Sequence, residues 1–207
     1  YGGGIIAAAA IGFAATILAF DSTRVTCTTP SSNTSGTALQ VDVITSTHGT
    51  AILAGGYTYN KTPAITSITP NNGPLAGGNV VAIAGSDFGG TLNVTFGANP
   101  ATILASTSSC VTVTAPAVSS PVTVPVTVTS SSNGWVASAS GYTYNPTPLA
   151  TSCGPAEGPC QGGTTINVTG TNFGALGETL SVTIGSVPAT SVTRVSSTLL
   201  TAVTGAF

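Results

Sequence analysis

The residues able to carry acid–base chemistry are few and lie far apart along the sequence. The carboxylates are Asp21, Asp42, Asp87, Glu157 and Glu178, and His48 is the single histidine. Catalysis needs an acid, a base or an activated nucleophile held in one cleft, and the many serines form no G-x-S-x-G motif. His48 precedes Gly49 and is expected to be a solvated turn residue. We therefore predict that the protein is not an enzyme and uses no cofactor.

Metal-binding patterns are equally sparse. Asp87 has no second carboxylate near it in the sequence, so we expect it to cap a turn locally rather than to bind calcium. The four cysteines are Cys27, Cys110, Cys153 and Cys160. They form neither a C-x-x-C pair nor a cluster with histidine, which argues against zinc and favours an oxidising compartment. We predict no metal site and an extracellular or cell-surface location.

Charge is scarce throughout the chain. Only 4% of the 207 residues are charged, and the basic ones are Arg24, Lys61 and Arg194. This leaves no electrostatic footprint for nucleic acid or for an anionic membrane. The apolar residues 1–20 reach the length of a membrane span, but they open with Gly2 to Gly4 and run into a repeat, so we expect no membrane insertion. A surface this poor in charge needs another source of hydration, such as covalent glycans.

Four Asn-x-Ser/Thr sequons supply candidate attachment sites for those glycans. They begin at Asn33, Asn60, Asn93 and Asn167. Asn93 and Asn167 each lie between two apolar residues of an expected strand. Because successive side chains of a strand point to opposite faces, we predict that these two asparagines point to water and carry sugar, with Asn33 and Asn60 next.

A repeat of about 86 residues organises the chain. The sequence ATILA at residues 15–19 returns at 101–105, and GYTYN at 56–60 returns at 141–145. We predict a complete module over 61–145, a partial module over 1–60 that lacks its opening strands, and a partial module over 146–207 that lacks its closing strands. Two explanations stay open: the sequence is a window of a longer array, or neighbouring subunits complete its ends.

Inside the complete module, apolar residues alternate with polar ones at the period of a strand. The alternating sets are Val81 and Ile83; Leu92, Val94 and Phe96; Val111 and Val113; and Val122, Val124, Val126 and Val128. Turn residues separate these sets, including Asn71-Asn72-Gly73-Pro74, Gly77-Gly78 and Asn133-Gly134. The expected fold is all-β, with two sheets packed through their apolar faces.

Several of these residues together resemble the IPT/TIG family of immunoglobulin-like domains. They are Pro63-Ala-Ile-Thr-Ser-Ile-Thr-Pro70, Gly73-Pro74, Gly77-Gly78, Gly85-Ser-Asp-Phe88, Val94-Thr-Phe-Gly97 and Tyr142-Thr-Tyr144, and the third module repeats the opening through Gly158-Pro159, Gly162-Gly163 and Gly170-Thr-Asn-Phe173. The resemblance covers nearly the whole chain and implies tandem immunoglobulin-like β-sandwiches. Such modules are expected to act as spacers, adhesive units or partner-binding units. The DNA-binding branch of the family works through basic loops, which this sequence lacks.

The third module departs from the family pattern at two cysteines. Cys153 and Cys160 stand where the middle module has Ile68 and Leu75, which implies an extra cross-link in the opening loop. The seven-residue separation is rich in Gly and Pro, so it allows the roughly 4.4–6.8 Å Cα separation of a disulfide. We predict a disulfide between these two residues. The pairing of Cys27 and Cys110 stays open.

These observations favour a structural subunit of a glycosylated extracellular fibre or surface stalk that assembles head to tail with copies of itself. Strand complementation is the expected contact, and Ile5, Ile6 and Ile11 lie in the apolar segment expected to make it. The alternative is an adhesin or a carbohydrate-binding accessory module of a larger secreted protein. Trp135 is the candidate sugar-stacking residue for that alternative, although edge-strand packing explains it as well.

Overall fold

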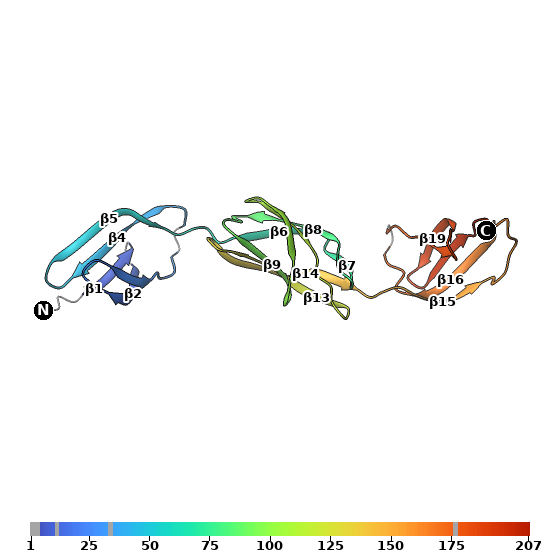
Figure 1. Cartoon of the computed structure of the whole chain (residues 1–207), viewed down its shortest axis with the longest axis horizontal. Helices are drawn as coiled ribbons and strands as arrows, with labels where there is room; N and C mark the ends of the chain where they lie inside the picture. The colour runs from blue at the N-terminus through green and yellow to red at the C-terminus, as the bar shows by residue number, and fades with distance from the viewer. Residues whose placement is uncertain (1–4, 11–12, 33–34, 176–177) are drawn as a thin grey trace.

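Strands account for the regular secondary structure of the computed structural model, which describes residues 5–10, 13–32, 35–175 and 178–207. They form three units that follow one another along the long axis, with the two ends of the chain at opposite ends (Figure 1). No helix able to span a membrane occurs in the described ranges. The fold is therefore an array of immunoglobulin-like modules, as the resemblance predicts.

The first unit is a curved arrangement of five strands. They are β1 (Ile5–Ala10), β2 (Phe13–Phe20), β3 (Val25–Thr28), β4 (Ala38–Thr45) and β5 (Gly49–Thr58), paired in the order β3-β2-β1-β4-β5. The neighbouring strands are antiparallel. Strands β4 and β5 form a long hairpin closed by Thr45 and Gly49.

The middle unit is a two-sheet sandwich. Its strands are β6 (Ala64–Thr69), β7 (Asn72–Pro74), β8 (Val80–Ser86), β9 (Leu92–Phe96), β10 (Asn99–Pro100), β11 (Thr102–Ser106), β12 (Cys110–Thr114), β13 (Val122–Ser130) and β14 (Gly134–Asn145). One sheet has the order β10-β9-β13-β14-β7 and the other β11-β12-β8-β6. Residues 72–74, expected to be part of a turn, instead pair in parallel with the end of β14.

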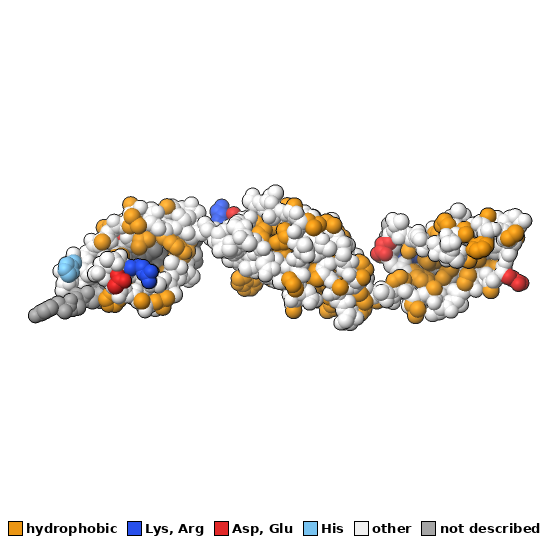
Figure 2. Space-filling model, in the orientation of Figure 1, with side chains coloured by type: hydrophobic (Ala, Val, Ile, Leu, Met, Phe, Trp, Pro, Cys, Tyr) orange, Lys and Arg blue, Asp and Glu red, His pale blue; other side chains and the backbone are white. Residues whose placement is uncertain are grey.

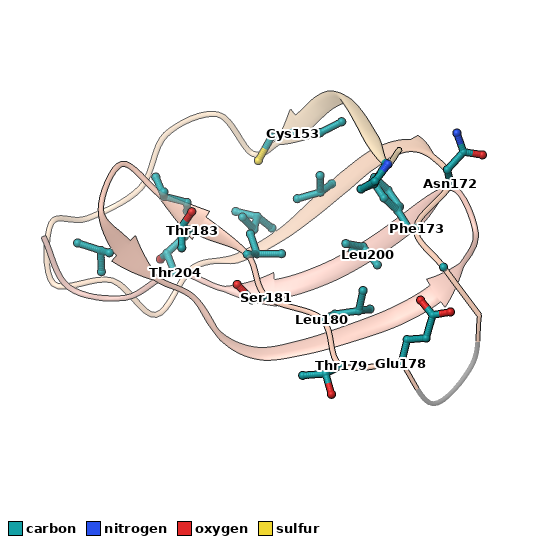
Figure 3. Close-up of a pocket in the computed structure, with 18 of the residues that line it drawn as sticks. Cys153, Asn172, Phe173, Glu178, Thr179, Leu180, Ser181, Thr183, Leu200 and Thr204 are labelled. Carbon is teal, nitrogen blue, oxygen red and sulfur yellow. The ribbon is translucent and has the colours of Figure 1, made fainter. Parts of the chain in front are cut away.

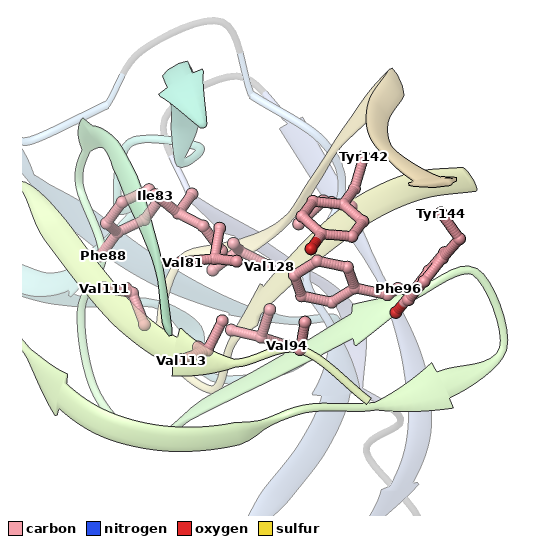
Figure 4. Packing of buried hydrophobic residues seen from close by; sticks show 12 residues of the cluster. Val81, Ile83, Phe88, Val94, Phe96, Val111, Val113, Val128, Tyr142 and Tyr144 are labelled. Atoms are coloured by element: carbon pink, nitrogen blue, oxygen red, sulfur yellow. The ribbon is translucent and has the colours of Figure 1, made fainter. Parts of the chain in front are cut away.

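The core of the middle unit lies between these sheets (Figure 4). Its fully buried members are Val81, Ile83, Val94, Phe96, Val111, Val113, Val126, Val128, Tyr142 and Tyr144. The Tyr142 ring contacts Phe96 and Tyr144 edge to face, with ring centroids 5.0 Å apart in each pair. The Tyr144 hydroxyl donates a hydrogen bond to the carbonyl of Pro116 at 2.8 Å. The predicted alternation is wrong at Val122, which is 42% exposed at the end of the β13–β14 ladder.

The third unit contains one four-stranded sheet and a short hairpin. Its strands are β15 (Leu149–Gly154), β16 (Thr165–Thr171), β17 (Thr183–Ile184), β18 (Val187–Pro188), β19 (Thr190–Ser196) and β20 (Leu199–Val203). The sheet order is β15-β16-β20-β19, and β17 pairs with β18. This sheet matches β6-β8-β12-β11 of the middle unit strand for strand.

The G-x-D/N-F motif fixes the same corner in both units. A Cβ at Gly85 would lie 2.0 Å from the carbonyl oxygen of Ala64, and a Cβ at Gly170 would lie 2.0 Å from that of Leu149. Only glycine therefore allows the neighbouring strand to approach so closely. Asp87 and Asn172 follow with φ near 60°, which turns the chain so that the next phenylalanine enters the core. Phe88 and Phe173 are 4% and 5% exposed.

Candidate functional site

A groove with a volume of about 1450 Å³ lies mainly in the third unit, and residues 72–74 of the middle unit border it. Its apolar lining includes Ile166, Phe173, Leu180, Ile184 and Leu200. Figure 3 shows Leu200 and Phe173 on the sheet side and Leu180 on the loop that precedes β17. Figure 2 shows apolar side chains on the visible face of this unit. The carboxylates of Glu157 and Glu178 also line the groove, so two acids that lie apart in the sequence border one largely apolar surface.

The middle unit shows which elements pack on the corresponding face of its own sheet. There, β13 and β14 carry Val126, Val128 and Tyr142 across the core toward the sheet that contains β8 and β12. The described residues of 146–207 include the counterparts of β8 and β12 but no counterpart of β13 and β14. Among the described residues, no hairpin packs on this face of the third unit, where Ile184 is 42% exposed.

The first unit has the reverse arrangement. Its β4–β5 hairpin corresponds to β13–β14, but among the described residues of 1–60 there is no counterpart of β6 and β8. Tyr57 is 39% exposed in this unit, whereas the matching Tyr142 is fully buried. The hairpin keeps its local contacts, because Tyr57 and Tyr59 remain edge to face at 5.0 Å and the Tyr59 hydroxyl donates to the carbonyl of Pro30 at 2.8 Å.

The predicted Cys153–Cys160 disulfide is not formed in this structure. Both residues are unpaired and exposed, as two of the four free cysteines. Cys153 extends β15, where it is paired with Val168, and its side chain points toward the groove (Figure 3). Cys160 lies in the following loop, where its carbonyl accepts a hydrogen bond from the Phe207 backbone N–H at 2.9 Å. The disulfide therefore stays a prediction that the structure does not support.

The predicted glycosylation sites differ in their surroundings. Asn93 and Asn167 are exposed on β9 and β16, so the predicted orientation toward water is confirmed, while the sugar itself stays a prediction. Asn60 is exposed and donates a hydrogen bond through Nδ2 to the carbonyl of Ser132 at 3.0 Å. Asn33 lies outside the described residues.

The predicted assembly residues fall in the least described part of the chain. Ile5 and Ile6 belong to β1, which pairs with β2 and β4, but their side chains are outside the described part. Ile11 lies outside it altogether. Their role in a subunit contact stays a prediction.

Asp21 and His48 interact with residues close to them in the sequence. Asp21 accepts hydrogen bonds from the backbone N–H and hydroxyl of Thr23 and from the backbone N–H of Arg24. These bonds, the Thr23 backbone bond above all, lower the pKa of the Asp21 carboxyl. His48 lies in the β4–β5 turn with Nδ1 2.8 Å from the hydroxyl of Thr47. Within the described ranges, no three His, Cys, Asp or Glu side chains gather in a group that could hold a metal.

Asp87 ends β8 in a turn that the backbone closes. Its carbonyl accepts hydrogen bonds from the backbone N–H of Gly89 at 3.0 Å and from Asn133 Nδ2 at 2.8 Å. The amide of Asn133, at the tip of the β13–β14 hairpin, thereby holds the β8–β9 turn. The sequence around Asp87 gave no signal for this distant partner.

The exposed face of the β9–β13–β14 sheet carries the single tryptophan of the chain. Trp135 is 65% exposed and lies directly opposite Thr129 of β13. Thr129 in turn lies opposite Asn93 of β9. The sequence singled out Trp135 and Asn93 separately, but only the strand register places them in one row.

Comparison with known proteins agrees with this architecture. A family model described as IPT/TIG domain matches residues 63–144 and 148–207. The chain is similar to the extracellular region of plexin A4, with 20% identity and a TM-score of 0.48 over 97% of this chain and 18% of that one. It is also similar to SGBP-B from a complex xyloglucan utilization locus in Bacteroides uniformis, with 14% identity and a TM-score of 0.38 over 83% of this chain and 50% of that one. The chain thus spans half or less of the length of these structures.

Proposed function

Because the chain belongs to the IPT/TIG domain family, we propose that it is a non-catalytic structural subunit of a glycosylated extracellular fibre or surface stalk. The observation that supports the proposal is the exposure of apolar side chains on two described surfaces. In the groove of the third unit Ile184 is 42% exposed, and on the β4–β5 hairpin of the first unit Tyr57 is 39% exposed. The two surfaces are complementary in kind, because the middle unit packs the same two elements against each other.

We propose that the β4–β5 hairpin of a second copy fills the groove, so that subunits add head to tail. Such a contact uses different surfaces on the two partners and propagates as a filament when the rotation does not close. The hairpin would place Tyr57 and Val43 where the middle unit has Tyr142 and Val128. Burying these apolar side chains supplies the driving force, at about 25 cal/mol for each Å² removed from water.

Two exposed residues of the third unit test this assembly. Ile184 lines the groove and is 42% exposed, so Ile184→Asp is compatible with the isolated fold but places a carboxylate in the proposed contact. We expect wild-type chains to form polymers with a fixed axial repeat in sedimentation and electron microscopy, and I184D to stay monomeric at the same concentration. Val195 is 57% exposed and does not line the groove, so Val195→Asp is the matched control and should polymerise. Equal assembly by both variants, or monomeric wild type at every concentration, would contradict the proposal.

A second candidate is a carbohydrate-binding module, which the exposed indole of Trp135 favours. Sugars stack on exposed aromatic faces because their C–H bonds pack against the ring. Titration of the unglycosylated chain with soluble oligosaccharides tests this candidate, since Trp135 is the only tryptophan and its fluorescence would report binding directly. A saturating change with one class of oligosaccharide would support it, and no change would exclude this site.

A further inference from the structure

The outer face of the middle unit holds a row of three side chains that joins a sequon to the single tryptophan. Asn93, Thr129 and Trp135 occupy directly opposed positions on β9, β13 and β14. All three are exposed. Asn93 opens the sequon Asn93-Val94-Thr95, and Val94 is fully buried on the other face, so the amide of Asn93 points away from the core.

We propose that a glycan on Asn93 lies along this row and stacks a pyranose ring on the indole of Trp135. The Cα atoms of Asn93 and Trp135 are two inter-strand spacings apart, or about 10 Å. An asparagine side chain extended by one or two pyranose rings spans this distance. The intervening Thr129 is short, so it leaves a low path across the sheet and offers a hydroxyl to the sugar.

The repeat itself provides a natural comparison. In the first unit the same row is Ala7, Ile44 and Thr50, paired in the same way. This row contains neither an asparagine nor a tryptophan. The asparagine and the indole therefore occur together in the middle unit and are absent together from the first, as expected of two parts of one site.

Asn167 provides a contrasting sequon. It is exposed on β16, and its directly opposed residues are Gly154 and Thr201. Neither neighbour has an aromatic face, so a glycan on Asn167 has no stacking partner in its row. The inference distinguishes the two sites: a glycan on Asn93 is docked on the protein, and one on Asn167 extends into solvent.

This inference depends on the glycosylation that forms part of the proposed function. The attachment reaction requires an activated sugar as the donor. A bond forms between Asn93 Nδ2 and the anomeric carbon of a sugar donor linked through phosphate. The bond from that carbon to the phosphate oxygen breaks, the phosphate departs as the leaving group, and one amide proton is lost. Amide resonance keeps the linkage planar, which limits the directions in which the first ring can leave the sheet.

The single tryptophan makes the test direct. The full chain, produced in a host that attaches N-linked glycans, is compared with the variants Asn93→Gln, Thr95→Ala and Asn167→Gln by acrylamide quenching of tryptophan fluorescence. N93Q and T95A both remove the Asn93 glycan, and T95A does so with the asparagine retained. We expect the quenching constant to rise about twofold in these two variants, since stacking covers one of the two faces of the indole. N167Q should quench like the wild type.

Intact-mass and glycopeptide measurements separate the ways in which the idea can fail. Absence of sugar at Asn93 in the wild-type chain would overturn this inference. The comparison of I184D with V195D in the assembly experiment would still test the proposed function independently. Sugar present at Asn93 with quenching equal to N93Q would overturn the stacking alone. A wild-type glycoprotein whose Trp135 still binds added oligosaccharide would also overturn it, because the indole would then be free.

Discussion

The middle and third units each contain an equivalent four-stranded sheet, but they differ in the residues that face this sheet. In both, the opening glycine pair, the G-x-D/N-F corner and the central strands β8 and β16 adopt the same arrangement. Gly85 and Gly170 donate to the carbonyls of Ser109 and Thr198 at 2.8 and 2.9 Å. Beyond this shared half, the middle unit buries Phe96 fully, whereas the matching Ile184 is 42% exposed. The comparison separates what one sheet specifies locally from what the packing of two sheets adds.

The largest effect should come from truncating the shared position on β9 and β17. Phe96→Ala leaves a cavity beside Tyr142 and should lower the free energy of unfolding of the middle unit by about 3–5 kcal/mol. Ile184→Ala removes only half-exposed surface and should cost under about 1 kcal/mol. Denaturant unfolding followed through Trp135 measures the first, and native-state hydrogen exchange of β20 measures the second.

The filament proposal adds a further expectation to the comparison of I184A with F96A. In polymers the I184A cost should increase, because a docked hairpin would bury the residue. A cost for I184A as large as that for F96A in the monomer would show that the groove is already closed, which would contradict the comparison.

An intermediate and equal effect is expected in the two units at the shared corner. Gly85→Ala and Gly170→Ala both place a methyl group 2.0 Å from a backbone carbonyl oxygen, and overpacking of this kind costs about 1–3 kcal/mol. Hydrogen exchange of β8 in one variant and β16 in the other gives the two costs. A loss of protection in only one of them would mean that the corners are not equivalent.

The smallest effect concerns the ionisation of a tyrosine that only the closed core buries. Burial raises the pKa of Tyr144 to about 12 from 10.0, and repulsion from Tyr142 adds to the shift. The unfolded chain therefore loses this proton first, so the stabilisation is complete below pH 10 and is lost as the pH rises toward 12. We expect about 1 kcal/mol less stability for the middle unit one pH unit above 10.

Denaturation midpoints over this pH range measure the tyrosine effect, with Tyr144→Phe as the control. The variant removes the ionisable hydroxyl and keeps the ring, so its stability should change less with pH. An unchanged slope in Y144F would assign the alkaline loss to other groups.

Much of the fold could be predicted from the sequence because the signals are local and repeated. The two-residue alternation of Val94 and Phe96 defines a strand and its buried face, and the repeated GYTYN segment marks the same strand in two units. The prediction was less accurate where a residue depends on a distant partner. Residues 72–74 were expected to turn, but the end of β14 draws them into a parallel pair.

The candidate sites were harder to predict for the same reason. The row from Asn93 to Trp135 depends on the register of three strands, and β9 lies far from β13 in the sequence, so no motif encodes the row. The cysteine prediction used the departure from the family pattern and the length and composition of the loop. In the structure Cys153 is held in an extended strand opposite Val168, so its direction is set by the sheet and not by the loop that leads to Cys160.

The hydrogen bond from Asn60 to Ser132 has a mechanical consequence. The chain enters the middle unit at β6 and leaves it from β14, at opposite ends of the unit (Figure 1). A pull along the array therefore acts lengthwise on the β13–β14 ladder, whose hydrogen bonds run across the strands and share the load rather than opening one after another. Asn60 donates a hydrogen bond from the incoming segment to Ser132 at the tip of that hairpin. Tension therefore acts first on this hydrogen bond and reaches the ladder only after the bond has broken.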